Sequence, residues 1–132
     1  MRKKILITGA ILGCLAVILG AFAAHGLKKV LSADQLHSFE TGVRYQMYHA
    51  LLLLIVGISG FITPKMQRLI YVFVLWGIVL FSGSIYLLAS KDVTSIDISS
   101  VGFITPIGGT LLIIGWIALI INFIKLKTEK IN

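Results

Sequence analysis

The sequence predicts an all-α membrane protein, a four-transmembrane-helix bundle with a short amphipathic interfacial helix between the first two spans. Hydrophobic residues make up 58% of the 132 residues, and the mean hydropathy of +1.00 lies far above that of soluble domains. Four apolar runs come close to the roughly 20 helical residues that cross a bilayer, and none of them contains a charged residue. Every Asp and Glu falls outside these runs, because a charge at the bilayer centre costs about 2.5–3.5 kcal/mol.

A single integral membrane domain is expected over residues 1–132, with spans at 5–24, 46–62, 69–89 and 106–124. The first run is longer than the apolar core of a signal peptide, so we expect it to remain as an uncleaved first helix. Cys14, the only cysteine, lies in the middle of that run and is expected to be a small packed residue without a redox role.

The interfacial helix is expected at residues 33–44. Ser32 and Gln35 have the spacing of a capping box, which marks the start of a helix. Leu36, Phe39 and Val43 then recur at helical intervals, while the charged residues of the segment face elsewhere. This pattern is typical of a helix that lies flat at the membrane surface.

The later spans are bounded by turn and loop signals. Thr63–Arg68 ("TPKMQR") predicts a tight antiparallel turn between the second and third spans. Ser90–Phe103 is the only long polar stretch and predicts an exposed loop. Thr105 and Pro106 are expected to be the cap and first-turn proline of the last helix.

Small residues recur at spacings of three and four on several spans, which allows the backbones of neighbouring helices to approach closely. Eight glycines are therefore expected at helix contacts: Gly9, Gly13, Gly20, Gly57, Gly83, Gly108, Gly109 and Gly115.

The net charge of +7 comes from Lys and Arg residues scattered in small groups beside the apolar runs, so it does not indicate a nucleic-acid surface. With both termini on one side, eight basic residues lie on that side and four on the other. Under the positive-inside rule this distribution predicts a multi-pass plasma-membrane protein with both termini in the cytoplasm.

One stretch, "YQMYHALLLL" at residues 45–54, places polar side chains immediately before a leucine run. If short connections bring the end of the first helix to the start of the second, His25 approaches Tyr45, Gln46 and His49, and these four residues form the candidate polar site. The histidine spacing matches no metal-ligand motif, so neither a metal nor a cofactor is expected. The alternative in which these side chains only anchor helix ends is favoured, because His and Tyr at membrane interfaces commonly do so.

Four blocks, "GAFAAHGL" (20–27), "YQMYHALLLL" (45–54), "FSGSIYLLA" (81–89) and "TPIGGTLLIIGW" (105–116), together resemble domain-of-unknown-function family 423. This family comprises small bacterial membrane proteins of the YgdD and YwdK type and is related to transmembrane protein 256. The resemblance spans nearly the whole chain and implies a four-helix plasma-membrane protein. It implies no reaction, because the family has no agreed catalytic residues. Ala23 departs from the pattern, which more usually has glycine there.

The function expected from these observations is non-enzymatic support of membrane or envelope properties through membrane lipids, further copies of the chain or another membrane protein. A small permease or channel component is the first alternative, with a polar site at His25, Gln46 and His49. A haem protein with two histidine ligands is the weaker alternative. No carboxylate lies within a span to mark an ion pathway, and the mid-helix residues Ser82 and Ser84 lack a partnering base nearby, which argues against transport and hydrolysis respectively.

Overall fold

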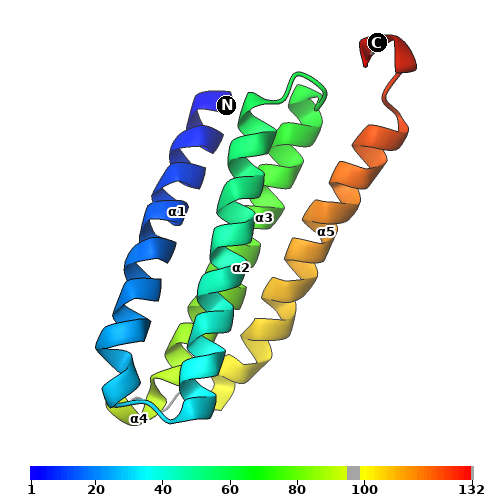
Figure 1. The fold of residues 1–132 in the computed structure, drawn as a ribbon. Helices are drawn as coiled ribbons and strands as arrows, with labels where there is room; N and C mark the ends of the chain where they lie inside the picture. Colours follow the sequence, from blue (N-terminus) through cyan, green and yellow to red (C-terminus); the bar gives the residue numbers. More distant parts are fainter. Residues whose placement is uncertain (95–98, 132) are drawn as a thin grey trace.

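The computed structural model of this chain describes residues 1–94 and 99–131. Four long helices form a bundle with both termini at the same end (Figure 1). They are α1 (Arg2–His25), α2 (Ala33–Ile58), α3 (Pro64–Ala89) and α5 (Ile104–Ile124). Short helical turns complete the described chain: η1 (Leu27–Lys29), α4 (Lys91–Thr94), η2 (Ser99–Phe103) and η3 (Thr128–Lys130). The all-α helical bundle predicted from the sequence is confirmed.

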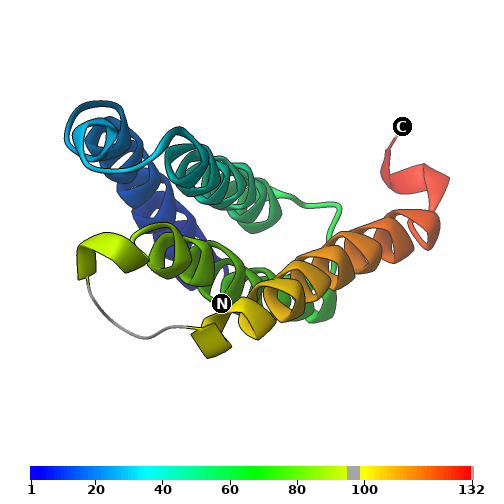
Figure 2. The same cartoon turned by 90° about the horizontal axis from the view of Figure 1, so that it is seen from below.

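The long helices pack in chain order, with α1 against α2, α2 against α3 and α3 against α5. The view along the bundle shows α1 and α5 at the two outer positions (Figure 2). One core cluster, which includes Ile5, Leu53, Val56, Ile70 and Val74, fills the end that carries the termini. A second cluster around Phe39 and Ala89 fills the other end.

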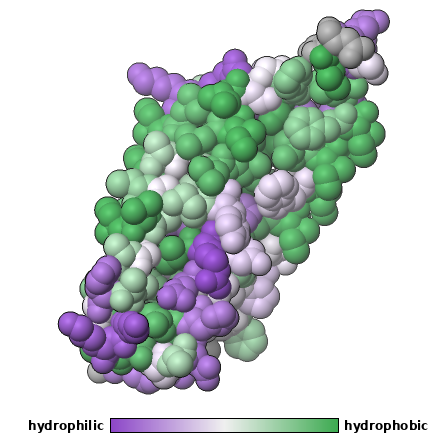
Figure 3. Space-filling view, in the orientation of Figure 1, coloured by the Kyte–Doolittle hydropathy of each residue, from purple (hydrophilic) through white to green (hydrophobic). Residues whose placement is uncertain are grey.

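The outward faces of the bundle are apolar. Large side chains such as Ile11, Ile55, Ile113 and Ile117 are about half exposed, and Figure 3 shows hydrophobic atoms over most of one face. Soluble monomers rarely expose so large a contiguous apolar area, whereas lipid solvates it. Three helical stretches of the described chain are long and apolar enough to cross a membrane: Arg2–Lys29, Pro64–Ala89 and Ser100–Ile124.

The predicted break between an interfacial helix at 33–44 and a span at 46–62 is wrong, because both segments belong to the single helix α2. The capping box of Ser32 and Gln35 starts this helix as expected, with both reciprocal hydrogen bonds formed. No proline interrupts the sequence that follows, and the polar side chains near residue 46 bond to other helices, so nothing stops the helical hydrogen bonds from continuing. The helix then ends four residues earlier than expected, at Ile58.

The short antiparallel connection predicted between the second and third long helices is present, but it lies earlier in the chain than Thr63–Arg68. Thr63 caps α3 by accepting a hydrogen bond from the Met66 amide at 3.3 Å, and Pro64 occupies the first helical turn. Proline is favoured there because its missing N–H would have no partner in the helix. The connection from α2 to α3 is therefore residues 59–63.

The boundaries of α5 differ slightly from the prediction. The helix begins at Ile104, two residues before Pro106, and the Thr105 hydroxyl pairs with the Ser84 hydroxyl at 2.5 Å instead of capping the helix. Within the loop predicted at Ser90–Phe103, the structure has the short helices α4 and η2, and residues 95–98 lie outside the described residues.

The predicted packing glycines fall into three groups. An added Cβ atom would lie 3.0 Å from the Ala50 carbonyl oxygen at Gly9, 2.6 Å from Leu6 Cδ2 at Gly57 and 2.8 Å from Val74 Cγ2 at Gly115. At Gly108 it would collide with the backbone of Phe81. An added Cβ at Gly13, Gly20 or Gly109 would make only ordinary contacts, and one at Gly83 would meet nothing within 4 Å. The expectation for Gly83 is therefore wrong.

Two close contacts were missed from the sequence. Gly42 lies against the ring of Tyr86, where an added Cβ would be 2.7 Å from Cε1, and Gly77 lies 2.6 Å from Leu112 Cδ2 by the same measure. Gly42 brings α2 close to α3, and Gly77 brings α3 close to α5. At both positions the Tyr86 or Leu112 side chain would have to shift to make room for a larger residue.

Candidate functional site

The polar residues of "YQMYHALLLL" lie in the interior of α2, not at its start. Gln46 and His49 are each 4% exposed, and Tyr45 is 41% exposed beside them. The helix thus carries two buried polar side chains, and each must find a hydrogen-bond partner on another helix or on the backbone to offset the cost of burial.

His49 is a residue of α2 whose side chain reaches α5. Its Nε2 atom accepts a hydrogen bond from the indole N–H of Trp116 at 3.0 Å, and its Nδ1 atom lies 2.6 Å from the carbonyl oxygen of Tyr45. An indole nitrogen can only donate and a carbonyl oxygen can only accept, so these partners fix a neutral imidazole with its proton on Nδ1. Both ring nitrogens are engaged.

Gln46, three residues before His49 on α2, joins three helices. Its Nε2 atom donates to the carbonyl oxygen of Leu12 on α1 at 2.8 Å, and its Oε1 atom accepts from the Tyr86 hydroxyl on α3 at 2.7 Å. One turn earlier, Ser82 donates to the carbonyl oxygen of Gly42 at 2.8 Å and adds a second link from α3 to α2.

Aromatic rings surround this polar layer. The ring of Tyr45 lies 5.1 Å from that of Phe81 and 6.3 Å from that of His49, and it meets Tyr48 edge to face at 5.8 Å. Tyr45, Tyr48 and Trp116 are between 41% and 53% exposed, so the layer reaches the surface of the bundle. Figure 3 shows polar colouring that runs from the lower end of the bundle up to the middle of one face.

His25 does not join this group. It is exposed at the end of α1, where its Nδ1 atom lies 2.9 Å from the Ala21 carbonyl oxygen. Leu12, the α1 residue that contacts Gln46, is thirteen residues away, which is about 20 Å along a helix. The predicted four-residue site is therefore wrong in its membership, because the continuous α2 carries Gln46 and His49 to half depth while His25 stays at the end.

The two histidines do not fit a single haem. Axial ligation by both requires nitrogens on opposite faces of one macrocycle, whereas His25 and His49 are separated by more than half the length of α1. Among the described residues, no group of three His, Cys, Asp or Glu side chains is placed to hold a metal ion. The bis-histidine alternative consequently has no geometric basis.

Further polar contacts lie towards the end that carries the termini. Arg2 donates to the carbonyl oxygens of Gly57 at 3.1 Å and Ser59 at 2.5 Å, which caps the C-terminus of α2. Gln67 donates to the Val56 carbonyl oxygen at 2.9 Å. Asn122 donates to the Phe61 carbonyl oxygen at 2.9 Å and accepts from the Thr63 amide at 3.2 Å.

Gln67, Asn122, Tyr86 and Trp116 were not predicted as partners. The available signal was that an amide or indole in an apolar run must bond to something when it is buried. That rule selects the residue but not its partner, since these contacts join positions 40 or more residues apart for three of the four.

Every buried side-chain nitrogen and oxygen in the described part of the chain has a hydrogen-bond partner. The polar groups around Gln46 and His49 therefore form hydrogen bonds that join different helices. The exposed edge of this layer, at Tyr45, Tyr48 and Trp116, turns side chains to the surroundings of the bundle.

Comparison with known proteins finds relatives that share one family description. The family model described as a protein of unknown function (DUF423) matches residues 19–109. A UPF0382 membrane protein of Haemophilus influenzae is 44% identical over 97% of this chain and 99% of its own length. YwdK of Bacillus subtilis, also a UPF0382 membrane protein, is 44% identical over 93% of this chain and 98% of its own.

The UPF0382 inner membrane protein YgdD of Escherichia coli is 35% identical over 98% of this chain and 96% of its own length. No solved structure matches the chain. The resemblance seen in the sequence blocks is confirmed, and the protein is a multi-pass membrane protein of the cell membrane. The chain belongs to the DUF423 family of UPF0382 membrane proteins.

Proposed function

We propose that this protein is a four-span, non-enzymatic component of the plasma membrane that supports membrane or envelope properties through contacts with lipids or other membrane proteins. The observation that carries the proposal is the complete satisfaction of the buried polar groups in the described residues. A catalytic site needs a nucleophile, acid or base that is free to meet a substrate, whereas these groups are committed to helix contacts.

The fourth span in this proposal is α2. Its 26 residues extend about 39 Å, which is enough to cross a hydrocarbon core about 30 Å thick. Gln46 and His49 bond to other helices and so avoid exposure to lipid. Arg44 is exposed close to the middle of the helix, and its guanidinium donates to the Thr41 hydroxyl at 3.0 Å, so the long side chain extends towards the headgroup region at the start of α2.

The orientation follows from the charge distribution. Both termini lie at the end that also contains Lys65 and Arg68, so the basic residues of that end outnumber those at the other. The positive-inside rule then assigns the terminal end to the cytoplasm.

Cysteine labelling in intact cells tests this topology. In a Cys14→Ala background, Val30→Cys is expected to react with a membrane-impermeant maleimide, and Gly60→Cys is expected to react only after the cells are opened. The two residues flank α2, and both are exposed. Reaction of both from outside would show that α2 does not cross the membrane.

The non-enzymatic role is tested in liposomes of defined lipid. We expect the purified protein to change the response of a membrane-order dye relative to protein-free liposomes, and a Gly108→Leu variant to lose that change because Gly108 contacts the Phe81 backbone. Turnover of a lipid or solute by the wild-type protein that disappears in the His49→Ala variant would contradict the proposal.

A small permease is the second candidate. The observation in its favour is that the polar layer at Gln46 and His49 reaches the surface beside Tyr45 and Tyr48. On this reading His49 lines a path, and the wild-type protein should carry a proton or solute flux through liposomes that is lost in the His49→Ala variant. Equal leak with and without protein would remove this candidate.

A further inference from the structure

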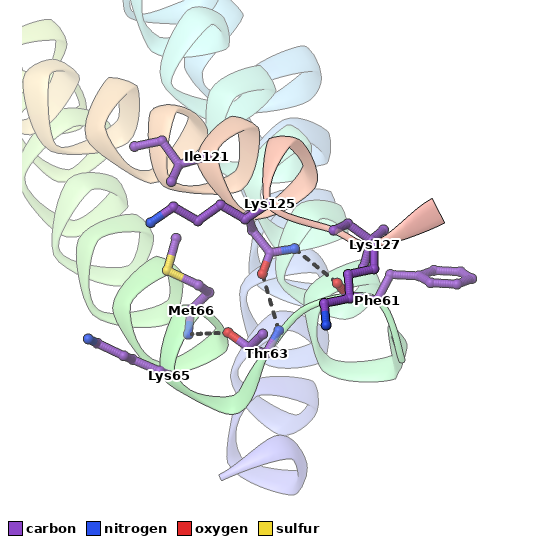
Figure 4. A pocket seen from close by; sticks show the side chains of 9 residues that line it. Phe61, Thr63, Lys65, Met66, Ile121, Lys125 and Lys127 are labelled. Atoms are coloured by element: carbon purple, nitrogen blue, oxygen red, sulfur yellow. Dashed lines mark hydrogen bonds between the residues drawn. The ribbon is translucent and has the colours of Figure 1, made fainter. Parts of the chain in front are cut away.

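A hollow of about 470 Å³ lies between the start of α3 and the end of α5, at the end of the bundle that carries the termini. Figure 4 shows it from close by. The residues that line it are Phe61, Thr63, Lys65, Met66, Ile121, Asn122, Lys125, Leu126 and Lys127.

The hollow has a fixed polar floor. Asn122 is 5% exposed, accepts from the Thr63 amide at 3.2 Å and donates to the Phe61 carbonyl oxygen at 2.9 Å. These two bonds hold the α2–α3 connection against α5, as the dashed lines of Figure 4 show. Because Asn122 is buried and its amide nitrogen and oxygen each bond to the connection, a ligand first meets the more exposed side chains around it.

The charge around this floor is of one sign. Lys65, Lys125 and Lys127 line the hollow, and none of the described residues that line it is acidic. The first turn of α3 also lacks an acidic residue and instead carries Lys65, which the positive end of a helix dipole disfavours. The end of α5 lies at the same hollow and offsets the dipole of α3, so the lysines are the charges that an anion in the hollow would compensate.

The wall is apolar on the side of the helices. Ile121 of α5 is 40% exposed, Met66 of α3 also lines the hollow, and Phe61 of the α2–α3 connection is 47% exposed. The hollow therefore joins a cationic region to a surface that continues onto the apolar face of α5. A ligand that fills it has an anionic head and an apolar tail.

We infer that this hollow binds the phosphate headgroup of an acidic phospholipid, with its acyl chains along α5. Basic pockets between transmembrane helices on the cytoplasmic side are suited to such headgroups. The inference rests on the proposed membrane topology, which places the hollow at the cytoplasmic headgroup level. The hollow at the other end is a natural comparison, because its lining contains one acidic residue, Asp34, and one basic residue, Lys91, and so has no excess of positive charge.

Native mass spectrometry of the full chain released from nanodiscs tests the inference. The nanodiscs contain phosphatidylcholine mixed with an equal amount of phosphatidylglycerol. We expect at least a fivefold preference for retained phosphatidylglycerol, reduced to less than twofold in the Lys65→Gln, Lys125→Gln, Lys127→Gln triple variant. The matched control, Lys28→Gln, Lys29→Gln, Lys91→Gln, removes the same charge from exposed positions at the other end and is expected to retain the preference.

An equal loss in both triple variants, or no preference in the wild type, would overturn the inference. A free anion is distinguished by adding inorganic phosphate, which is expected to leave phosphatidylglycerol retention unchanged. Displacement of the lipid by inorganic phosphate would show a site for soluble anions and would also overturn it. The labelling of Val30→Cys and Gly60→Cys, repeated in the triple variants, reports the topology separately, so failure of lipid binding with normal labelling refutes only this inference.

Discussion

Trp116 of α5 donates its indole N–H to Nε2 of His49, on α2, across 3.0 Å. These two helices are not neighbours in the packing order of the bundle. The imidazole completes its bonding through the Tyr45 carbonyl oxygen at 2.6 Å. This pair of side chains links α2 to α5, two helices whose backbones make little direct contact.

Replacing Trp116 by phenylalanine is therefore expected to destabilise the bundle by about 0.5–2 kcal/mol, because His49 Nε2 loses its donor. Trp76→Phe provides the matched control, since Trp76 is 55% exposed on α3. Unfolding of both variants is measured by steric trapping in bicelles. A loss of stability that is no larger for Trp116→Phe than for Trp76→Phe would show that the hydrogen bond contributes nothing.

Gly108 and Gly83 give a second matched pair. Gly108→Ala places a methyl group against the Phe81 backbone and is expected to cost about 1–3 kcal/mol through overpacking. Gly83→Ala meets open space and is expected to raise stability by up to about 1 kcal/mol, because alanine favours the helical state. Thermal unfolding in detergent distinguishes the signs. Equal melting temperatures for the two variants would mean that α3 and α5 do not approach closely at Gly108.

The start of α2 could be predicted from the sequence, whereas its length could not. Its start at Ala33 follows from the capping box, which is a local pattern. Its continuity past Gln46 did not follow, because an amphipathic segment before an apolar run has the same pattern whether it lies on the membrane or enters the bundle. The deciding contacts come from Tyr86 and Trp116, 40 and 67 residues away.

The glycines show the same limit. Periodicity identified a row of small residues on each helix, but a close neighbour depends on how the helices are arranged. Gly77 lies against Leu112. Gly83, six positions later on the same helix, has no neighbour within 4 Å of an added Cβ. Spacing places these two glycines about 120° apart around α3, at about 100° per residue, but it does not tell which of the two faces meets α5.

Gln46 and Tyr86 are expected to couple energetically. In a double-mutant cycle of Gln46→Leu and Tyr86→Phe, the interaction energy should be about 0.6 kcal/mol and no more than about 1.7 kcal/mol, the range found for hydrogen bonds between membrane helices. The control cycle pairs Gln46→Leu with Gln67→Leu. Gln67 bonds to the Val56 and Ser59 carbonyl oxygens, shares no partner with Gln46 and should therefore be additive. Similar coupling in both cycles would indicate a global change in the bundle and not a direct bond.

Arg2 is expected to stabilise the end of a helix to which it does not belong. Its guanidinium donates to the carbonyl oxygens of Gly57, Ile58 and Ser59, the C-terminal groups of α2 that have no partner within that helix. The last turn of α2 contains no basic residue of its own, so Arg2 also supplies the positive charge that the helix dipole favours there.

Arg2→Met should weaken this turn by about 1 kcal/mol, which corresponds to roughly fivefold faster amide exchange at Gly57–Ser59. Lys3→Met removes the same charge from the neighbouring exposed position and should leave that exchange unchanged, because charge alone does not satisfy the carbonyl oxygens. Faster exchange in both variants would attribute the effect to the charge of the first turn of α1, and unchanged exchange in both would show that α2 ends without help from Arg2.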